Sequence, residues 1–364
     1  MKKIAITLPV KKLINFWSNG LGQNAITLYK MLVKQGYDVW ILTDKEFQAK
    51  KAVELRNINH KHFLKCSKKK EKFDLVIECG FSFQGGMEEH RKNIAKNSVS
   101  LKYGNELMWD LETVTNLGCS RGMIGTSLEP MGQIWTSPHY DFAREYIRVK
   151  HKASEVKIAP YVWSPSFLEA AIQKSNKDPR YTPGEKKRIG VFEPNVQMTK
   201  SSLIPSMICE DAFNMGVPFD AAHIFCTEEI RKSSSVVNLF KNMNVYQAKK
   251  IFYESRYNTV FALANYVDVV LSHHTYNSLN YVTLEALYLD YPVVHNSEDF
   301  KDAGYFYKEF NIGEGAKALK DAVLNHDDNI EEYKKIAKKY IEKYSPENPK
   351  NIQGYIDLIE SAIK

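Results

Sequence analysis

Short apolar runs alternate with segments of helical periodicity along most of this 364-residue chain, and this alternation constrains the fold more than any other feature. Strands and helices in such an order are joined by right-handed crossovers, which produce a parallel sheet covered by helices. We therefore expect a doubly wound α/β domain in the first half. Its strands are predicted at 3–10, 38–43, 73–80, 98–103, 133–137 and 156–159, and its helices at 23–35, 88–96 and 139–151.

A polar stretch at residues 174–187 carries almost nothing apolar and interrupts this pattern. The alternation then restarts, with strands predicted at 188–193, 221–226, 267–272 and 292–295, and helices at 201–214, 234–242, 257–266, 280–289, 315–325 and 327–342. We expect an N-terminal domain at 1–173, a linker at 174–187 and a second doubly wound domain at 188–345. A C-terminal helix at 346–364 is expected to pack back on the first domain.

Cysteine usage, hydropathy and charge narrow the class of protein. The cysteines are scattered and form no C-x-x-C pair, which predicts reduced thiols without a disulfide frame or a zinc site. The N-terminus is typical of a strand rather than a signal peptide, and no window approaches the roughly 20 apolar residues of a membrane span. We expect a soluble, cytoplasmic protein. The formal charge of +7 lies in short basic clusters, at 68–70, 150–152, 186–188 and 249–250.

These basic clusters have two interpretations. Taken singly, each is typical of a solvated face. Taken together, they suit an anionic partner, which can be a nucleotide, a nucleic acid or an acidic membrane surface.

The segment 281–296 combines a short helix with a strand that begins at Pro292. The helix carries one carboxylate, Glu285, on an otherwise apolar surface. An ionised carboxylate offers the acceptors that a ribose diol needs for its two hydroxyl donors. Alternatively, Glu285 is a solvated side chain on an ordinary helix–strand unit.

Glu285-Ala-Leu followed by Pro292-Val-Val resembles the donor-site signature of GT-B glycosyltransferases. The resemblance implies two Rossmann-like domains with a deep interdomain cleft, an acceptor domain first and a nucleotide-sugar donor domain second, with C-terminal helices. It also implies that Glu285 binds the donor ribose. The expected donor is a UDP-sugar, with no obligatory metal cofactor and at most a stimulating divalent ion.

Two further resemblances cover more of the chain. The region from Tyr276-Asn277 to Asp299-Phe300 is similar in layout to the T-even phage DNA glucosyltransferases. Nearly the full length resembles a family of bacterial and phage GT-B-like proteins, through motifs that include 17–24, 192–195, 203–205 and 295–297. Retaining GT-B enzymes often carry a carboxylate eight positions before the ribose glutamate. This chain has Asn277 there, which leaves the stereochemistry open.

Candidate donor-binding residues lie in loops that follow predicted strands, where α/β proteins bind their ligands. Gly20, Gly22 and Gln23 belong to the loop after the first strand, which is either a plain turn or an approach to donor phosphate. Lys200, near the predicted start of a helix, is the candidate for the diphosphate. The other candidates for the donor site are Asn195, Thr199, His273, Asn277 and Asn280. His273 and His274 alone make a poor metal site.

A general base that deprotonates an acceptor hydroxyl is expected in the first domain, just past the end of a strand. The carboxylates in such positions are Glu106 and Asp110, four residues apart, and Glu78. Each alone can be a helix cap or a surface charge. His139, after the predicted strand 133–137, is a weaker candidate.

The predicted function is transfer of a hexosyl or pentosyl group from a nucleotide-sugar to a hydroxyl. A hydroxymethylated pyrimidine of phage DNA, modified in the bacterial host cytoplasm, is narrowly favoured as acceptor because of the phage-like layout and the basic clusters. The alternative acceptor is a capsular or surface polysaccharide. A non-catalytic protein that binds nucleotides or sugars is the alternative from another class.

Overall fold

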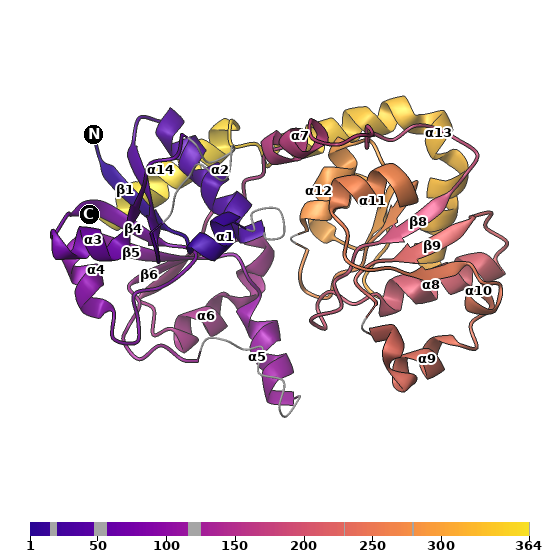
Figure 1. Ribbon diagram of the computed structural model, residues 1–364, viewed down its shortest axis with the longest axis horizontal. Coiled ribbons are helices and arrows are strands. Elements are labelled where there is room, and N and C mark those ends of the chain that lie inside the picture. Colours follow the sequence, from indigo (N-terminus) through magenta and orange to yellow (C-terminus); the bar gives the residue numbers. More distant parts are fainter. Residues whose placement is uncertain (15–19, 47–56, 116–124, 229, 279, 364) are drawn as a thin grey trace. The chain divides into compact units, whose positions relative to one another are not determined.

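The computed structural model describes residues 1–14, 20–46, 57–115, 125–228, 230–278 and 280–363. The chain folds as two compact units. Unit 1 consists of Met1–Phe167 together with Tyr344–Lys364, and unit 2 consists of Leu168–Lys343 (Figure 1). The helix α7 (Ser166–Ile172) contains the first crossing between them.

In the described part of unit 1, seven parallel strands form one sheet in the order β3-β2-β1-β4-β5-β6-β7. The strands are β1 (Lys3–Thr7), β2 (Asp38–Thr43), β3 (His60–His62), β4 (Phe73–Glu78), β5 (Ala95–Lys102), β6 (Gln133–Thr136) and β7 (Glu155–Ile158). The helices are α1 (Val10–Ile14), α2 (Gly20–Lys34), α3 (Phe63–Lys68), α4 (Glu88–Ile94), α5 (Glu106–Thr115), α6 (Arg144–Lys150) and α14 (Pro349–Ile363).

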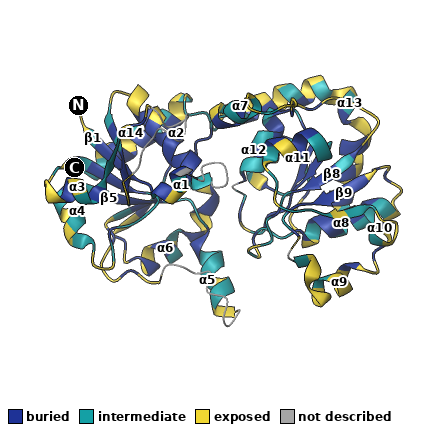
Figure 2. Cartoon of the chain, viewed as in Figure 1, coloured by how far each residue is buried: buried dark blue, intermediate teal, exposed yellow. Residues whose placement is uncertain are grey.

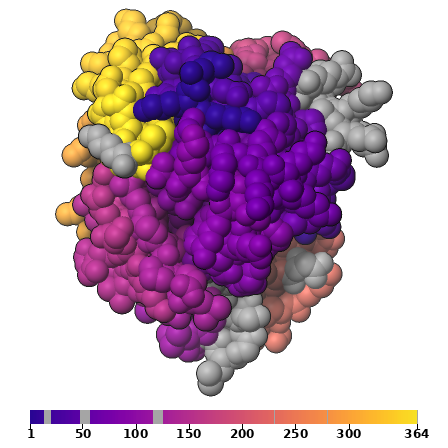
Figure 3. Space-filling view, turned by 90° about the vertical axis from the view of Figure 1, so that its left-hand side faces the viewer, coloured from indigo at the N-terminus to yellow at the C-terminus, as the bar shows by residue number. Residues whose placement is uncertain are grey.

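Alternation of side chains along the strands gives unit 1 a core on each face of its sheet. Ile4 and Ile6 of β1 belong to the core that α2 covers, and Ala5 belongs to the opposite core beneath α3 and α4. Figure 2 shows the central strands buried beneath these helices. Helix α14 completes the first core with Tyr355, whose ring lies 6.4 Å from that of Trp135. The C-terminal residues (yellow) therefore lie beside the N-terminal ones (indigo) in Figure 3.

Unit 2 has a second parallel sheet, of six strands among its described residues, in the order β10-β9-β8-β11-β12-β13. The strands are β8 (Arg188–Val191), β9 (Ala221–Ile224), β10 (Ile251–Tyr253), β11 (Val269–Leu271), β12 (Val293–His295) and β13 (Tyr305–Phe306). The helices are α8 (Leu203–Asn214), α9 (Ser234–Phe240), α10 (Asn244–Gln247), α11 (Thr259–Tyr266), α12 (Tyr281–Tyr288) and α13 (Ile312–Glu342).

The core of unit 2 lies between this sheet and the helices α8 and α13. Ile189 and Val191 of β8 point into it, and Gly190 between them faces the other side of the sheet. A Cβ atom on Gly190 would meet Val267 at 2.5 Å, so only glycine fits where the end of α11 meets the sheet. The doubly wound α/β architecture expected from the sequence is thus present in both units.

Several elements differ from the sequence predictions. Three strands were not predicted: β3, β10 and β13, which are two or three residues long and form the edges of the sheets. The helices predicted at 315–325 and 327–342 are one continuous helix, α13. A loop was expected between the predicted strand 3–10 and the predicted helix 23–35, and this is wrong in part, because α1 covers Val10–Ile14 and α2 begins at Gly20.

The polar stretch 174–187 lies inside unit 2 rather than between the units. Tyr181 in this stretch is buried, and its hydroxyl donates a hydrogen bond of 2.5 Å to Asp327. The ammonium of Lys187 lies 2.7 Å from the same carboxylate. Hydrogen bonds and an ion pair therefore hold a stretch that is too polar to be recognised by hydrophobic periodicity.

Membrane insertion finds no support in the helices that the structure describes. None of them combines the length and the apolarity that crossing a bilayer requires.

Candidate functional site

The strand order of unit 2 reverses between β8 and β11, so the loops that follow these neighbouring strands diverge. A crevice at such a point is the usual ligand site of an open α/β sheet. The loop after β8 carries Asn195, Thr199 and Lys200, and the loop after β11 carries His273 and Asn277. The structure therefore brings these five of the ten predicted donor-binding residues to the carboxyl ends of two neighbouring strands.

Asn195 shapes the first of these loops. Its backbone is left-handed, with φ of +53°, a conformation that asparagine tolerates better than most residues. Its side-chain oxygen accepts hydrogen bonds from the backbone nitrogen and the hydroxyl of Ser202, at 2.8 and 2.9 Å. The carbonyl of Thr199 accepts a bond of 3.2 Å from the backbone nitrogen of Thr275. These contacts give Asn195 and Thr199 a role in building the loop.

Lys200 is half-buried just before α8 begins. Burial lowers the pKa of its ammonium, and the charge of the nearby Glu193 opposes that shift. A partly desolvated ammonium is well suited to an anion. Lys200 therefore lies where a phosphate group would be stabilised.

Glu193 is a member of the site that the sequence did not single out. It is 1% exposed, and its Oε1 accepts hydrogen bonds from Ser272 Oγ at 2.6 Å and from the backbone nitrogen of His273 at 3.2 Å. Burial raises the pKa of this carboxyl, while the bond from Ser272 and the charge of Lys200 act in the opposite direction. It ends the predicted strand 188–193 and lies in the motif 192–195, but its role was not apparent because its partners lie 79 and 80 residues away.

Buried polar side chains organise the loop after β11. Asn280 caps α12 by accepting a bond of 3.1 Å from the nitrogen of Val282, and its Nδ2 lies 2.8 Å from Nε2 of His274. Nδ1 of His273 lies 2.9 Å from the hydroxyl of Tyr307. Asn277 is also buried. Asn280 therefore has a structural role, in addition to its predicted place near the sugar.

Glu285 lies on α12, on a turn whose neighbours Leu284 and Ala286 are fully buried. Burial raises the pKa of Glu285 to about 7, against the hydrogen bond between its side chain and Thr259. The carboxylate of Glu285 thus contacts Thr259, the first residue of α11, and is weakly hydrated. Hydroxyl donors from a ligand would stabilise the ionised form of such a carboxyl and lower its pKa.

Metal binding has no support in the geometry. Within the described ranges, no three His, Cys, Asp or Glu side chains gather as a metal site requires.

In unit 1, the predicted acids Glu106 and Asp110 share one buried cluster of charges. The carboxylate of Glu106 lies 3.1 Å from Lys102 Nζ, 3.0 Å from Lys150 Nζ and 2.7 Å from His151 Nε2. Burial alone would raise the pKa of Glu106, but the hydrogen bond from His151 and the two lysine charges bring it well below its usual range. Asp110 lies 2.5 Å from Lys150 Nζ.

This cluster corrects one expectation from the sequence. Residues 150–152 were expected to form a solvated face or to attract an anion, but Lys150 is 6% exposed and His151 is 1% exposed. The side chains of Lys150 and His151 are directed at the acids of α5. A run of basic letters does not reveal such internal pairing.

Glu78, the third predicted acid, is also buried. It accepts a hydrogen bond of 3.1 Å from the backbone nitrogen of Phe83, and the guanidinium of Arg91 lies 3.8 Å away. Burial raises its pKa, against that backbone hydrogen bond and the charges of Arg91 and Lys102. Lys102 therefore connects Glu78 electrostatically with Glu106.

His139 lies in the turn after β6. Its Nδ1 is 2.6 Å from the hydroxyl of Ser137, and its ring packs edge-on against Tyr161, with centroids 5.2 Å apart. This surrounding fixes the orientation of the imidazole. The serine hydroxyl can either donate to this nitrogen or accept from it, so the contact orients the ring without selecting its tautomer.

Gly20, Gly22 and Gln23 belong to the first turn of α2 rather than to a loop. Gly22 and Gln23 are buried there. The preceding positions of the motif, 15–19, lie outside the described residues. The first turn of a helix still offers backbone N–H groups, so the predicted approach to phosphate remains a prediction.

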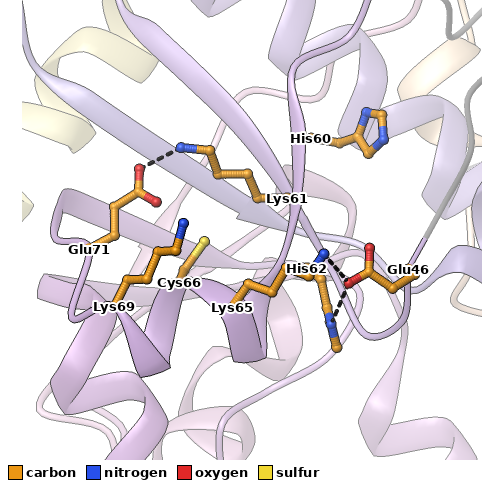
Figure 4. A pocket seen from close by; sticks show the side chains of 8 residues that line it. All are labelled: Glu46, His60, Lys61, His62, Lys65, Cys66, Lys69 and Glu71. Atoms are coloured by element: carbon orange, nitrogen blue, oxygen red, sulfur yellow. Dashed lines mark hydrogen bonds and ion pairs between the residues drawn. The ribbon is translucent and has the colours of Figure 1, made fainter.

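A separate pocket in unit 1, of about 270 Å³, lies between β3 and α3 (Figure 4). Its charges largely pair with each other: Lys61 lies 2.6 Å from Glu71, and Lys65 lies 2.7 Å from Glu46. The pocket therefore lacks the concentrated positive charge that the basic clusters suggested. Its lining residues are Glu46, His60, Lys61, His62, Lys65, Cys66, Lys69 and Glu71.

Comparisons place this geometry among known proteins. A family model described as "Protein of unknown function (DUF2827)" matches residues 4–359. No curated protein matches the chain.

Three solved structures share the fold. They are a Staphylococcus aureus TarM variant with fondaparinux, alpha-GlcNAc-glycerol and UDP (16% identity, TM-score 0.53), a glycosyltransferase from Rickettsia africae (11%, 0.55), and Anabaena HepE with UDP and glucose (12%, 0.56). The match to TarM covers 78% of this chain and 55% of the TarM chain. The match to the Rickettsia protein covers 100% of this chain and 99% of that one, and the match to HepE covers 99% of this chain and 100% of that one. This chain therefore spans about half the length of that TarM chain. These likenesses identify the fold as GT-B.

Proposed function

The chain belongs to the DUF2827 family, and we propose that it is a glycosyltransferase. The proposal rests on its GT-B fold and on the side chains at the carboxyl ends of β8 and β11. It transfers a hexosyl or pentosyl group from a nucleotide-sugar, in the first instance a UDP-sugar, to a hydroxyl acceptor. UDP is present in the TarM and HepE structures, which supports the choice of nucleotide.

The observation that carries the proposal is the half-buried Lys200 ahead of α8, at the switch point of the second sheet. Nucleotide-sugar cleavage leaves a diphosphate that gains negative charge as the glycosidic bond breaks. A fixed ammonium stabilises that charge in the transition state without reorganising. Lys200 therefore acts on the leaving group.

Glu285 supports the same assignment through the ribose. Its carboxylate is poorly hydrated, as the raised pKa indicates, and it has only acceptor atoms to offer when ionised. A ribose diol supplies the complementary donors. We assign Glu285 to the ribose and the loop after β11 to the sugar.

The acceptor hydroxyl attacks the anomeric carbon of the donor, and its proton passes to a base in unit 1. Asp110 and His139 suit this role better than Glu106, whose depressed pKa makes it a weak base. Glu78, held by Phe83 and Arg91, is the remaining carboxylate. These assignments of the base are proposals for mutagenesis.

Two acceptors compete. The hydroxymethylated pyrimidine of DNA rests on the sequence resemblance, and the comparisons add no support to it. A glycan acceptor is favoured by the TarM structure, which contains alpha-GlcNAc-glycerol. Incubation with each acceptor class, followed by mass spectrometry of nucleosides or of oligosaccharides, decides between them.

The first experiment tests the donor. We expect calorimetry to detect UDP and UDP-sugar binding, and Lys200→Ala to weaken UDP binding by at least tenfold, whereas Lys338→Ala, on the exposed face of α13, leaves it unchanged. Slow hydrolysis of a UDP-sugar in the absence of acceptor would separate an enzyme from a binding protein. If none of UDP, UDP-glucose, UDP-galactose or UDP-N-acetylglucosamine binds, this donor assignment is wrong.

A further inference from the structure

Two buried acceptor atoms at the switch point of unit 2 have no hydrogen-bond partner among the described residues. The first is Oε2 of Glu193. The other oxygen of that carboxylate, Oε1, already accepts from Ser272 Oγ and from the backbone nitrogen of His273. Oε1 therefore links Glu193 to the loop after β11, whereas Oε2 accepts no hydrogen bond from the described residues.

The second atom is Nε2 of His273, a side chain that is 2% exposed. The hydroxyl of Tyr307 lies 2.9 Å from Nδ1 of this ring and 3.3 Å from the carbonyl of Ser272. The carbonyl can only accept, so the phenol donates to it, and Nδ1–H of His273 donates to the phenol oxygen. Nε2 is then an unprotonated acceptor. Burial, which lowers the pKa of His273 to about 4, keeps the ring neutral.

A buried acceptor without a donor is destabilising, so native proteins rarely leave one unpaired. A ligand for these two atoms must bring hydrogen-bond donors. An ionised phosphate or carboxylate group is excluded because its oxygens only accept hydrogen bonds. A divalent cation is disfavoured because the positive charge of Lys200 acts on Glu193. Hydroxyl groups of a neutral molecule meet the requirement.

We propose that Glu193 Oε2 and His273 Nε2 accept hydrogen bonds from hydroxyl groups of the donor sugar and so determine which sugar is bound. This inference rests on the proposed function, because Lys200 beside Glu193 assigns the neighbouring space to the diphosphate. A site built from buried acceptors rejects a ligand that lacks the matching hydroxyl, since the acceptors then stay unpaired. Discrimination between sugars should therefore exceed what shape alone provides.

Glu193→Gln tests the inference with little change in shape. Glutamine keeps one oxygen to accept from Ser272 and His273, but places an NH₂ donor where the unused acceptor was. By calorimetry, we expect UDP affinity to stay within twofold of wild type. Affinity for the tightest-binding of UDP-glucose, UDP-galactose and UDP-N-acetylglucosamine should fall at least tenfold.

Glu332→Gln, the same substitution at an exposed acid of α13, is the matched control and should leave the affinities for UDP and for the UDP-sugar unchanged. A second measurement does not depend on a folded variant. Wild-type protein should bind monodeoxy analogues of the preferred UDP-sugar, and at least one should be at least tenfold weaker.

Three results would overturn the inference. One is parallel or absent loss of UDP and UDP-sugar affinity in Glu193→Gln. Another is tolerance of every deoxy analogue, and the third is UDP-sugar binding that a chelator abolishes in wild type but not in the variant, which would indicate a metal site. Wild-type protein that binds neither UDP nor any UDP-sugar refutes the proposed function itself, and the inference with it.

Discussion

Replacing Glu285 by glutamine should weaken nucleotide-sugar binding and remove its pH dependence. The carboxylate has a pKa of about 7 in the free protein because it is buried, so at pH 6 only about a tenth is ionised, and at pH 8 about nine tenths. If the ionised form accepts from the ribose, affinity should fall about tenfold between pH 8 and pH 6. At pH 8 the loss of a charge-assisted hydrogen bond should cost about 1.5–3 kcal/mol, or roughly 10- to 150-fold.

The assay is calorimetry with a UDP-sugar at pH 6, 7 and 8. A UDP-sugar is preferable to UDP, whose terminal phosphate itself titrates near pH 6, as phosphate monoesters do. Glu332→Gln, an exposed acid on α13, serves as the control and should behave as wild type. Equal affinities of wild type and Glu285→Gln at pH 8, or an unchanged pH profile in the variant, would refute the role of Glu285.

Glu285→Gln should weaken nucleotide-sugar binding but stabilise the fold. The folded-state pKa of Glu285 is raised above its unfolded value, so ionisation costs nothing below pH 4. The cost grows as the pH rises from about 4.5 to 7 and stays constant above 7. Glu285→Gln should therefore melt at a higher temperature than wild type at pH 8, and at the same temperature at pH 4.

Three further predictions concern other parts of the chain. Lys200→Ala should weaken UDP binding by about 1.5–3 kcal/mol and leave uridine binding unchanged, because only the phosphates lose a charged partner; equal losses for both ligands would contradict this. Glu106→Gln should lower the free energy of unfolding, measured by denaturant titration, by about 3–5 kcal/mol, since it removes a charge that balances the buried Lys150. Asp110→Asn should instead reduce turnover, measured by steady-state kinetics, about 100-fold or more at unchanged donor affinity. Normal turnover in Asp110→Asn would assign the base to His139. Tyr355→Ala should cost about 3–5 kcal/mol in denaturant unfolding, because a fully buried aromatic ring leaves a cavity in unit 1; a loss below 1 kcal/mol would contradict the packing.

The sequence predicted the central strands well because both of their faces are buried. β1 contains the apolar run Ile4–Ile6 and β4 the apolar run Leu75–Ile77, as expected for strands of a parallel sheet covered by helices. Three of the four edge strands, β3, β10 and β13, were not predicted, because an edge strand buries less of its surface. β3 consists of His60, Lys61 and His62, all half-exposed, so its membership of the sheet rests on backbone hydrogen bonds that leave no hydrophobic pattern.

The candidate site was predictable where a single segment carries the signal. Lys200 and Glu285 belong to short motifs, and each lies beside a helix end or a buried strand. Glu193 was missed because its meaning depends on Ser272 and His273, which join it only when β8 and β11 pair. The internal pairing of Lys150 was hidden likewise, since Glu106 is 44 residues away in the sequence.

The return of α14 to unit 1 has a consequence for the order of folding. The hydroxyls of Tyr103 and Tyr355 meet at 3.3 Å across 252 residues of chain, and closing so long a loop is slow and costs entropy. The backbone of Trp163, however, donates a hydrogen bond of 2.8 Å to Tyr344, so the two chain segments that flank unit 2 lie together. Once unit 2, a continuous segment, has folded, it brings these flanks near each other and shortens the loop that remains. During synthesis, the surface of the first sheet that α14 covers stays exposed until α14 has left the ribosome, and exposed apolar surface makes the nascent chain prone to aggregation in this interval.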